Sequence, residues 1–294
     1  SLAYAQGAKA DCYSEVGGGA LTTKYGVFKK GKAGDGDAIL VIGSDLYAEA
    51  PIFWLRAKQA ADRGATLIVA SEAETRLDAF ATTLVRSVDE GLKAAKEAFA
   101  NADETVVLYK GDDALAKACA DLNPTTLIGV WEGANTQGAW EMGYEALADL
   151  SALSGKTVYV AGGEALVAAA VDAADIVIAQ TAYETESTGK ASVALASRVV
   201  AEMDGTFTSA ERRAQRFFTA VPAIGDSLPG YVITAQVAEK MGVTLDINAE
   251  DIFADFSDMS YADLAKLNID ERLMIAGTCF ANDQGVGATL PAKA

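Results

Sequence analysis

The chain has 294 residues, with 24 Lys and Arg against 41 Asp and Glu, so its formal net charge is −17, and it contains no His. The missing imidazole excludes a His general base, a Ser-His or Cys-His nucleophile and a His-ligated metal site. The acidic balance repels phosphates and anionic lipid headgroups, so we expect neither nucleic acid nor a lipid surface as a direct partner.

An apolar fraction of 51% is ample for buried cores, and a prior of roughly 150 residues per domain favours two domains. The three Cys, at positions 12, 119 and 279, are too widely spaced for a disulfide framework or a cluster ligand set, so we expect buried, reduced thiols. No apolar run is long enough to span a membrane. The chain begins at Ser1 without a signal-peptide pattern, which is typical of a segment or a trimmed chain.

Residues 1–36 are rich in Gly and lack periodicity, which predicts an irregular start. From residue 37 onward, short apolar runs alternate with stretches of helical spacing, the pattern of a parallel α/β sheet. In the first half we expect strands at 38–42, 66–70, 105–109 and 127–130, and helices at 50–63, 88–101 and 114–122.

The second half repeats this alternation after a junction at residues 149–155, which we take as the domain boundary. We expect strands at 156–160 and 176–179 and helices at 165–173 and 231–242, while 192–200 fits either a strand or a helix. Two short amphipathic stretches follow within 249–268, and the end of the chain is expected to be a loose tail.

Ligands of open parallel sheets bind at the carboxyl ends of the strands. Acids follow the strands here, in the sequences Gly43-Ser44-Asp45, Ser71-Glu72-Ala73-Glu74, Gly111-Asp112-Asp113 and Gly162-Gly163-Glu164. Carboxylates in a first helical turn complement the helix dipole but repel a phosphate, and no glycine-rich nucleotide motif is present. The pattern favours structural capping over a cofactor role.

Two other segments carry candidate functional residues. Residues 131–143 place Asn135, Gln137 and Gly138 after a strand, where they fit either a polar ligand site or an amide network that closes the domain. In residues 202–216, Arg212 and Arg213 could hold a phosphate or a carboxylate, but ion pairing with Glu211 and neighbouring acids is favoured.

Four segments in order resemble the molybdopterin oxidoreductase superfamily. The first segment is similar to the family's strand, "GSNP", helix and "RGAKLIVVDPRxT" stretch; it comprises residues 37–45 with Pro51 and Arg56, and then 63–69 with Thr75-Arg76-Leu77-Asp78. The second, residues 135–143, resembles "NxxGxxxMG". The third, residues 175–180 with Glu184-Thr185-Glu186, resembles "DFVVVQDxFxTET", and the fourth, residues 205–215, resembles "GTFTNxERRVQ". The resemblance covers about residues 37–243.

The resemblance implies two lobes of parallel, Rossmann-like layers with helices on both faces. An inserted domain would span residues 1–149, a second and partial α/β domain 150–243, and a helical tail 244–294. It assigns vestigial cofactor-binding positions and implies neither a catalytic residue nor a metal ligand; the positions are Ser44, Glu72, Thr75, Arg76, Asn135, Gly138, Thr185, Thr206, Arg212 and Arg213.

Departures from the family pattern place acids where a cofactor would need other groups. Asp45 stands for Asn, Glu72-Ala73-Glu74 for Asp-Pro-Arg, and Ser209 for Asn. Each change weakens binding of a pyranopterin guanine dinucleotide, and the acids in place of Asn and Arg weaken it most, because carboxylates repel its phosphates. We therefore expect no molybdopterin and no other cofactor in this chain.

The cofactor-less branch that the sequence most resembles is the large iron–sulfur subunit of NADH:quinone oxidoreductase, respiratory complex I. This implies a non-catalytic docking domain that supports electron transfer, with iron–sulfur clusters on a preceding N-terminal part. Its partners would be other subunits of the peripheral arm, on the cytoplasmic side of the cell membrane. Two alternatives stay open: part of a formate-dehydrogenase-like molybdoenzyme that binds the dinucleotide, and an unrelated small-molecule-binding α/β module that uses residues 135–138.

Overall fold

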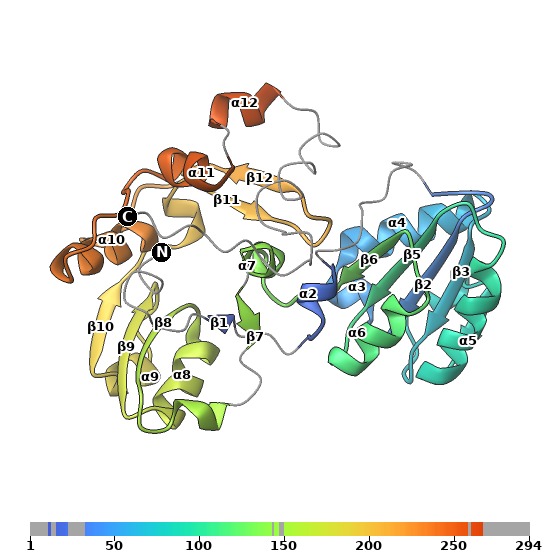
Figure 1. Ribbon diagram of the computed structural model, residues 1–294, viewed down its shortest axis with the longest axis horizontal. Helices are drawn as coiled ribbons and strands as arrows, with labels where there is room; N and C mark the ends of the chain where they lie inside the picture. The colour runs from blue at the N-terminus through green and yellow to red at the C-terminus, as the bar shows by residue number, and fades with distance from the viewer. Residues whose placement is uncertain are drawn as a thin grey trace.

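The computed structural model describes residues 11–12, 16–22, 33–142, 144–146, 150–257 and 260–266. Within them, two parallel α/β units lie at opposite ends of the view in Figure 1, with a β-hairpin between and above them. This arrangement confirms the predicted α/β class with parallel layers flanked by helices. The domain limits at 149/150 and 243/244 stay predictions.

The first unit is a five-stranded parallel sheet with helices on both faces. Its strands are β2 (Ala38–Ile42), β3 (Thr66–Ala70), β4 (Thr83–Val85), β5 (Thr105–Tyr109) and β6 (Thr126–Gly129). Its helices are α3 (Leu46–Glu49), α4 (Pro51–Asp62), α5 (Val88–Phe99) and α6 (Asp113–Ala120), with a 3₁₀ turn, η1 (Asp78–Phe80). The strand order is β4-β3-β2-β5-β6. The order therefore reverses direction between β2 and β5, which defines the topological switch point of a doubly wound sheet.

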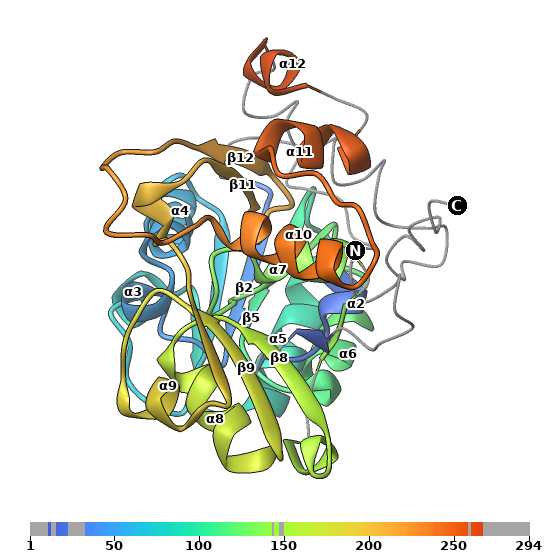
Figure 2. The same cartoon turned by 90° about the vertical axis from the view of Figure 1, so that its left-hand side faces the viewer.

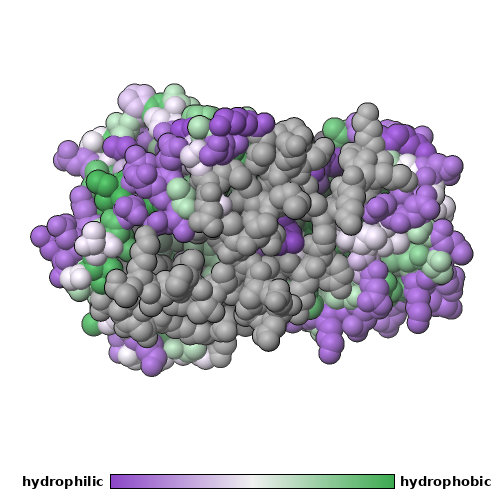
Figure 3. Space-filling model, turned by 45° about the horizontal axis from the view of Figure 1, so that its top comes forward, coloured by the Kyte–Doolittle hydropathy of each residue, from purple (hydrophilic) through white to green (hydrophobic). Residues whose placement is uncertain are grey.

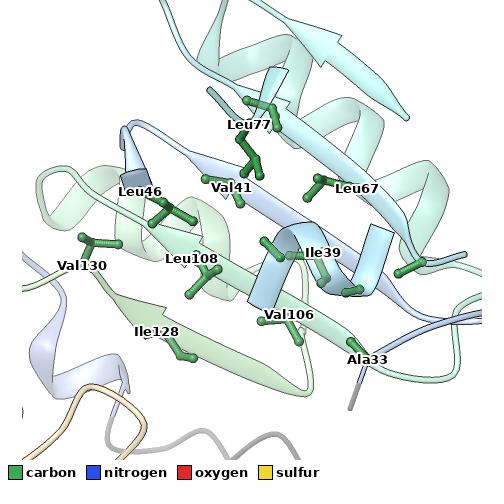
Figure 4. Packing of buried hydrophobic residues seen from close by; sticks show 14 residues of the cluster. Ala33, Ile39, Val41, Leu46, Leu67, Leu77, Val106, Leu108, Ile128 and Val130 are labelled. Carbon is green, nitrogen blue, oxygen red and sulfur yellow. The ribbon is translucent and has the colours of Figure 1, made fainter. Parts of the chain in front are cut away.

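Every residue of β2 and of β5 is buried, as expected for apolar central strands that are covered on both faces. Alternate side chains point to opposite faces, so each central strand feeds two cores. Figure 4 shows the core under α4, where Ile39, Val41 and Leu108 lie together. On the opposite face, Leu40 and Val107 pack with α5 and α6. Cys119 of α6 is buried there, as expected; the side chains of the other two Cys lie outside the described residues.

The expectation of an irregular start is wrong for residues 11–12 and 19–22, although residues 16–18 are irregular. The chain forms the short helix α2 (Gly19–Thr22), and β1 (Asp11–Cys12) pairs with β7 (Glu145–Ala146). Val16 is buried in the first unit's core, and an added Cβ on Gly19 would lie 1.9 Å from the Trp140 ring. Glycines have no side chains and so give no apolar periodicity, but here their backbone packs directly against an aromatic ring.

The second unit is a three-stranded parallel sheet of order β10-β9-β8. Its strands are β8 (Thr157–Ala161), β9 (Ile176–Thr181) and β10 (Val193–Ala196), and the nearby helices are α8 (Glu164–Ala173), α9 (Glu186–Lys190) and α10 (Gly230–Lys240), with 3₁₀ turns η2 (Leu150–Leu153) and η3 (Val200–Glu202). The ambiguous stretch 192–200 thus supplies a strand. Figure 2 shows α8 and α9 beside this sheet, to the left of β8 and β9 in that view.

The hairpin pairs β11 (Gly205–Thr208) with β12 (Ala214–Phe217) in antiparallel register. Helices α11 (Ala249–Ser257) and α12 (Tyr261–Lys266) follow, and Phe253, Tyr261 and Leu264 form a small core with Ala214. The short helix α7 (Thr136–Glu141) replaces the loop expected after β6. The predicted loose tail lies outside the described residues.

Hydrophilic side chains cover much of the five-stranded unit on the face in Figure 3, as the net charge of −17 suggests. In the part of the chain that the structure describes, no helix has the length and apolar character needed to cross a bilayer.

Candidate functional site

The exits of β2 and β5 meet at the switch point of the first sheet. Gly43, directly after β2, has φ of +73°, and a Cβ there would lie 2.2 Å from the Lys110 carbonyl oxygen. Only glycine allows both this backbone conformation and this close approach. The two exits are therefore pressed together at the place where ligands of such sheets usually enter.

A single carboxylate joins these exits. The Ser44 hydroxyl donates a hydrogen bond of 2.6 Å to Glu49, and the Lys110 ammonium donates one of 2.6 Å to the other oxygen of Glu49. Ser44 is buried, whereas Lys110 and Glu49 are about one-third exposed. The hydroxyl and the cation that could hold a phosphate at the switch point are thus bound to the chain's own carboxylate.

The backbone donors at these exits are also occupied. Asp45 accepts a hydrogen bond from the Tyr47 amide at 3.2 Å, and Asp112 accepts one from the Leu115 amide at 2.9 Å. Asp113 accepts one from the amide of Gly18 at 2.7 Å. These bonds confirm the capping interpretation at Asp45 and Asp112, and they remove N–H groups that an anion would need.

The loop after β3 is closed from the end of β4. Arg86 donates to the carbonyl oxygens of Ser71 and Ala73 at 3.3 and 3.1 Å and to the Asp78 carboxylate at 2.6 Å. Thr75 donates to the same carboxylate at 2.6 Å. Burial alone would raise the pKa of Asp78, but the hydrogen bonds from Arg86 and Thr75 outweigh it and hold that pKa below its usual value.

The other predicted residues of this loop point elsewhere. Glu72 is exposed, and the Arg76 guanidinium lies 3.8 Å from the centroid of the Tyr47 ring. This cation–π contact ties the loop to α3. The loop is held by contacts with Arg86 and Tyr47, which flank it.

Helix α7 brings together several residues that are far apart in the sequence. Asn135 accepts a hydrogen bond of 2.7 Å from the amide of Thr208, and a Cβ on Gly138 would lie 2.4 Å from the Asn135 side-chain oxygen. Arg212 binds Glu141 through two hydrogen bonds, of 2.6 and 3.0 Å. The favoured ion-pair interpretation therefore holds for Arg212, although with Glu141 as the acid.

Arg213 is buried, and its Nε lies 3.8 Å from a Glu211 oxygen, which also meets the favoured interpretation. Glu211 has a second cation, Arg56 of α4, at 2.5 Å. The basic cluster that the sequence suggests as an anion site is thus engaged with carboxylates of the chain.

The second unit has a more open turn. Gly163 precedes α8 without a side-chain cap, and a Cβ added to it would meet no atom within 4 Å. Glu164 at the first position of α8 accepts a hydrogen bond from Thr185, which caps α9. Hydrogen bonds from Thr185 and Ser187 lower the pKa of Glu164. The start of α8 thus has no side-chain cap, and the Glu164 carboxylate lies beside it.

The ten predicted positions therefore fall into five places. Asn135, Gly138 and Arg212 lie together around α7, and Arg213 follows in the hairpin turn. Ser44 lies at the switch point, and the loop after β3 holds Glu72, Thr75 and Arg76. Thr185 belongs to the second unit, and Thr206 of β11 donates to Tyr261 at 3.1 Å.

Sequence reasoning missed Glu49, Lys110, Arg86 and Glu141. Lys110 directly follows a predicted strand, so its position was the one available signal; its partner lies 61 residues away and depends on strand order. Among the described residues, no group of three or more Cys, Asp and Glu is placed to hold a metal ion.

This geometry defines a doubly wound α/β unit joined to a second parallel unit, and comparison with known proteins adds sequence evidence. The chain is 41% identical over 91 residues to F420-dependent formate dehydrogenase 2 subunit alpha of Methanococcus maripaludis. It is 38% identical over 87 residues to F420-dependent formate dehydrogenase subunit alpha of Methanocaldococcus jannaschii. The matches cover 31% and 29% of this chain, and only 14% and 13% of those relatives.

Among solved structures, acetylene hydratase from Pelobacter acetylenicus shares the fold, with a TM-score of 0.50 and 12% identity. The similarity covers 92% of this chain and 54% of that one. No family model matches the chain. The relatives support the resemblance to the molybdopterin oxidoreductase superfamily, whereas the narrower resemblance to a complex I subunit finds no counterpart among them.

Proposed function

We propose that this chain forms the α/β core of a subunit of a formate-dehydrogenase-like oxidoreductase. The observation that carries the proposal is the 41% identity over 91 residues to a formate dehydrogenase alpha subunit. The doubly wound sheet and the second parallel unit are consistent with it, because both present strand ends and helix N-termini where such proteins could hold a dinucleotide.

The residues of the first unit do not fit a pyranopterin guanine dinucleotide at the switch point. Glu49 accepts hydrogen bonds from both Ser44 and Lys110. Asp45 and Asp112 accept hydrogen bonds from backbone amides at the starts of α3 and α6. Bringing a diphosphate there would place its negative charges against these carboxylates. The Gly162–Gly163 turn of the second unit fits better, since it has no side-chain cap and has room above Gly163, although the Glu164 carboxylate beside it would have to turn away from the phosphates.

Guanosine diphosphate tests this proposal, because it carries the base and phosphates of the dinucleotide. We expect the nucleotide to raise the melting temperature of the protein by about 3 °C at ten times its Kd. Gly163→Glu should abolish the shift by adding a carboxylate at the open turn. Arg76→Ala should preserve it, because Arg76 belongs to the first unit. Loss of the shift in Arg76→Ala alone would instead assign the nucleotide to the first unit.

A second candidate is the docking domain of a complex I iron–sulfur subunit, peripheral on the cytoplasmic side of the membrane. The specific observation in its favour is the switch point closed by Glu49, since a cofactor-free scaffold needs no open crevice there. In that case guanosine diphosphate should leave the melting temperature of the protein and of both variants unchanged. Binding of subunits of a peripheral arm, measured by co-purification, would then be expected.

A further inference from the structure

The turn between β11 and β12 lies against the first unit, far from its own place in the sequence. We call residues 208–213 the strap. The Thr208 amide binds Asn135, and Ala210 packs against the core of the five-stranded sheet. Glu211 meets Arg56 of α4. Figure 1 shows the connection between β11 and β12 extending from the hairpin toward the five-stranded unit.

The strongest of these contacts is the pair between Arg212 and Glu141. The Glu141 side chain is 1% exposed and that of Arg212 is 12% exposed, and the two hydrogen bonds make a bidentate fork. A buried charge that loses its partner is strongly destabilised, because it has given up its hydration. By contrast, Arg56 is 47% exposed, so its pair with Glu211 contributes little.

The Glu141 carboxylate also belongs to a buried hydrogen-bond network. Gln137, fully buried, donates to Glu141 at 2.8 Å, and its oxygen accepts hydrogen bonds from Trp131 at 3.0 Å and Thr22 at 3.2 Å. These bonds fix the carboxylate of Glu141 before Arg212 reaches it. The acceptor is therefore preorganised by α2, the loop after β6 and α7 itself.

Arg212 also adopts an unusual backbone conformation. Its φ is +62°, in the left-handed region that glycine enters most easily. An arginine in that region carries a backbone cost that its side-chain interactions must offset. The combination of strain, burial and a preorganised acceptor indicates that the side chain is the reason for an arginine at this turn.

We infer that Glu141 is a positioning residue that, through Arg212, latches the strap onto the first unit. The latch keeps the hairpin and the strand exits of the five-stranded sheet in one fixed arrangement. Breaking it releases the strap while both α/β units stay folded. The latch acts whichever group, if any, the strand exits bind.

Hydrogen exchange of the full chain, followed by mass spectrometry, tests the latch. Arg212→Gly removes the guanidinium but keeps a residue suited to a positive φ, so it isolates the ion pair. We expect the amides of peptides covering 205–217 to exchange about 100-fold faster in this variant. Peptides from β2 and β5 should change by less than about twofold, since local opening does not require global unfolding.

Three further variants sharpen the result. The double variant Glu141→Gln with Arg212→Gly should exchange no faster than Arg212→Gly alone, because both changes break one interaction. Arg212→Lys should give an intermediate increase, of about tenfold, because an ammonium cannot form the bidentate fork. Arg56→Ala is the matched control and should leave the strap protected.

Two outcomes overturn the inference. One is unchanged exchange in residues 205–217 of Arg212→Gly. The other is an equal increase in every peptide of the chain, including those of the milder Arg212→Lys, since that would make the pair a contributor to global stability and not a latch.

Discussion

Gly19 is packed so tightly that adding a single methyl group tests the packing. Gly19→Ala would place a Cβ 1.9 Å from the Trp140 ring, so the ring or the backbone must move. We expect this variant to lose about 3 kcal/mol of unfolding free energy, measured by urea denaturation. Gly163→Ala, where a Cβ meets nothing within 4 Å, is the control and should cost less than about 1 kcal/mol, the small penalty of Ala for Gly at a helix N-cap. Equal stability of the two variants would contradict the packing described here.

Cys119 gives a second prediction at the scale of a residue. Burial raises the pKa of its thiol from 9.0 to about 12. Because the thiolate is the reactive form, Cys119 should resist iodoacetamide at pH 8 in the native protein and react readily in urea. Mass spectrometry of the peptide that carries Cys119 measures this directly. Rapid native labelling at this residue would show that α6 does not cover it as described.

The raised pKa of the Cys119 thiol also predicts how the unfolding free energy depends on pH. A raised pKa in the folded state means that the folded protein holds the proton more tightly than the unfolded chain. The contribution to stability is therefore complete below pH 9 and is lost as the pH rises towards 12. A Cys119→Ala variant should lack this part of the alkaline loss.

At the scale of elements, Arg86 determines the structure of the loop after β3. Arg86→Ala removes hydrogen bonds to two carbonyl groups and to Asp78, and Arg86 is 41% exposed. We expect a loss of about 1 kcal/mol in unfolding free energy at pH 7, measured by urea denaturation. Lys96→Ala, on the neighbouring helix α5, serves as a surface control.

The lowered pKa of Asp78 predicts how this loss depends on pH. The carboxylate is stabilised in the folded state, so its contribution is present above its ordinary pKa of 3.8 and disappears as the pH falls through the lower folded value. The difference in stability between the parent and Arg86→Ala should therefore shrink below pH 3.8. A difference that stays constant into the acid range would mean that Arg86 acts through the carbonyl groups alone.

The central strands were predictable because a strand buried on both faces must be apolar throughout. Ala38–Ile42 and Thr105–Tyr109 have this composition, and both match the expected limits. The hairpin was not predicted as such, since Thr206 and Gln215 carry no alternating apolar pattern and its register is set by contacts with α7 and α12. Helix α7 was missed because its buried face carries Gln137 and Glu141 in place of apolar residues.

The candidate site was predictable only in its local chemistry. Acidic residues that follow strands predicted helix caps, and the structure confirms such caps at Asp45 and Asp112. The pairs of Lys110 with Glu49 and of Arg212 with Glu141 join residues 61 and 71 positions apart. Such pairs depend on strand order and on how the hairpin folds back, which no local pattern contains.

At the scale of the whole molecule, the chain combines a doubly wound first unit, whose switch point is occupied by the chain's own carboxylate, with a second parallel α/β unit. Acidic side chains therefore lie at the strand exits as well as on the surface. The stretches matched to the formate dehydrogenase alpha subunits make up only 14% and 13% of those relatives.

The most direct test of the central proposal is a cofactor analysis of the protein purified without oxygen from its own host. If the chain is the core of a formate-dehydrogenase-like oxidoreductase, acid hydrolysis should release GMP, and elemental analysis should find molybdenum or tungsten in stoichiometric amounts. Protein that is intact by mass yet yields neither GMP nor either metal would contradict the proposal and favour the cofactor-free docking domain.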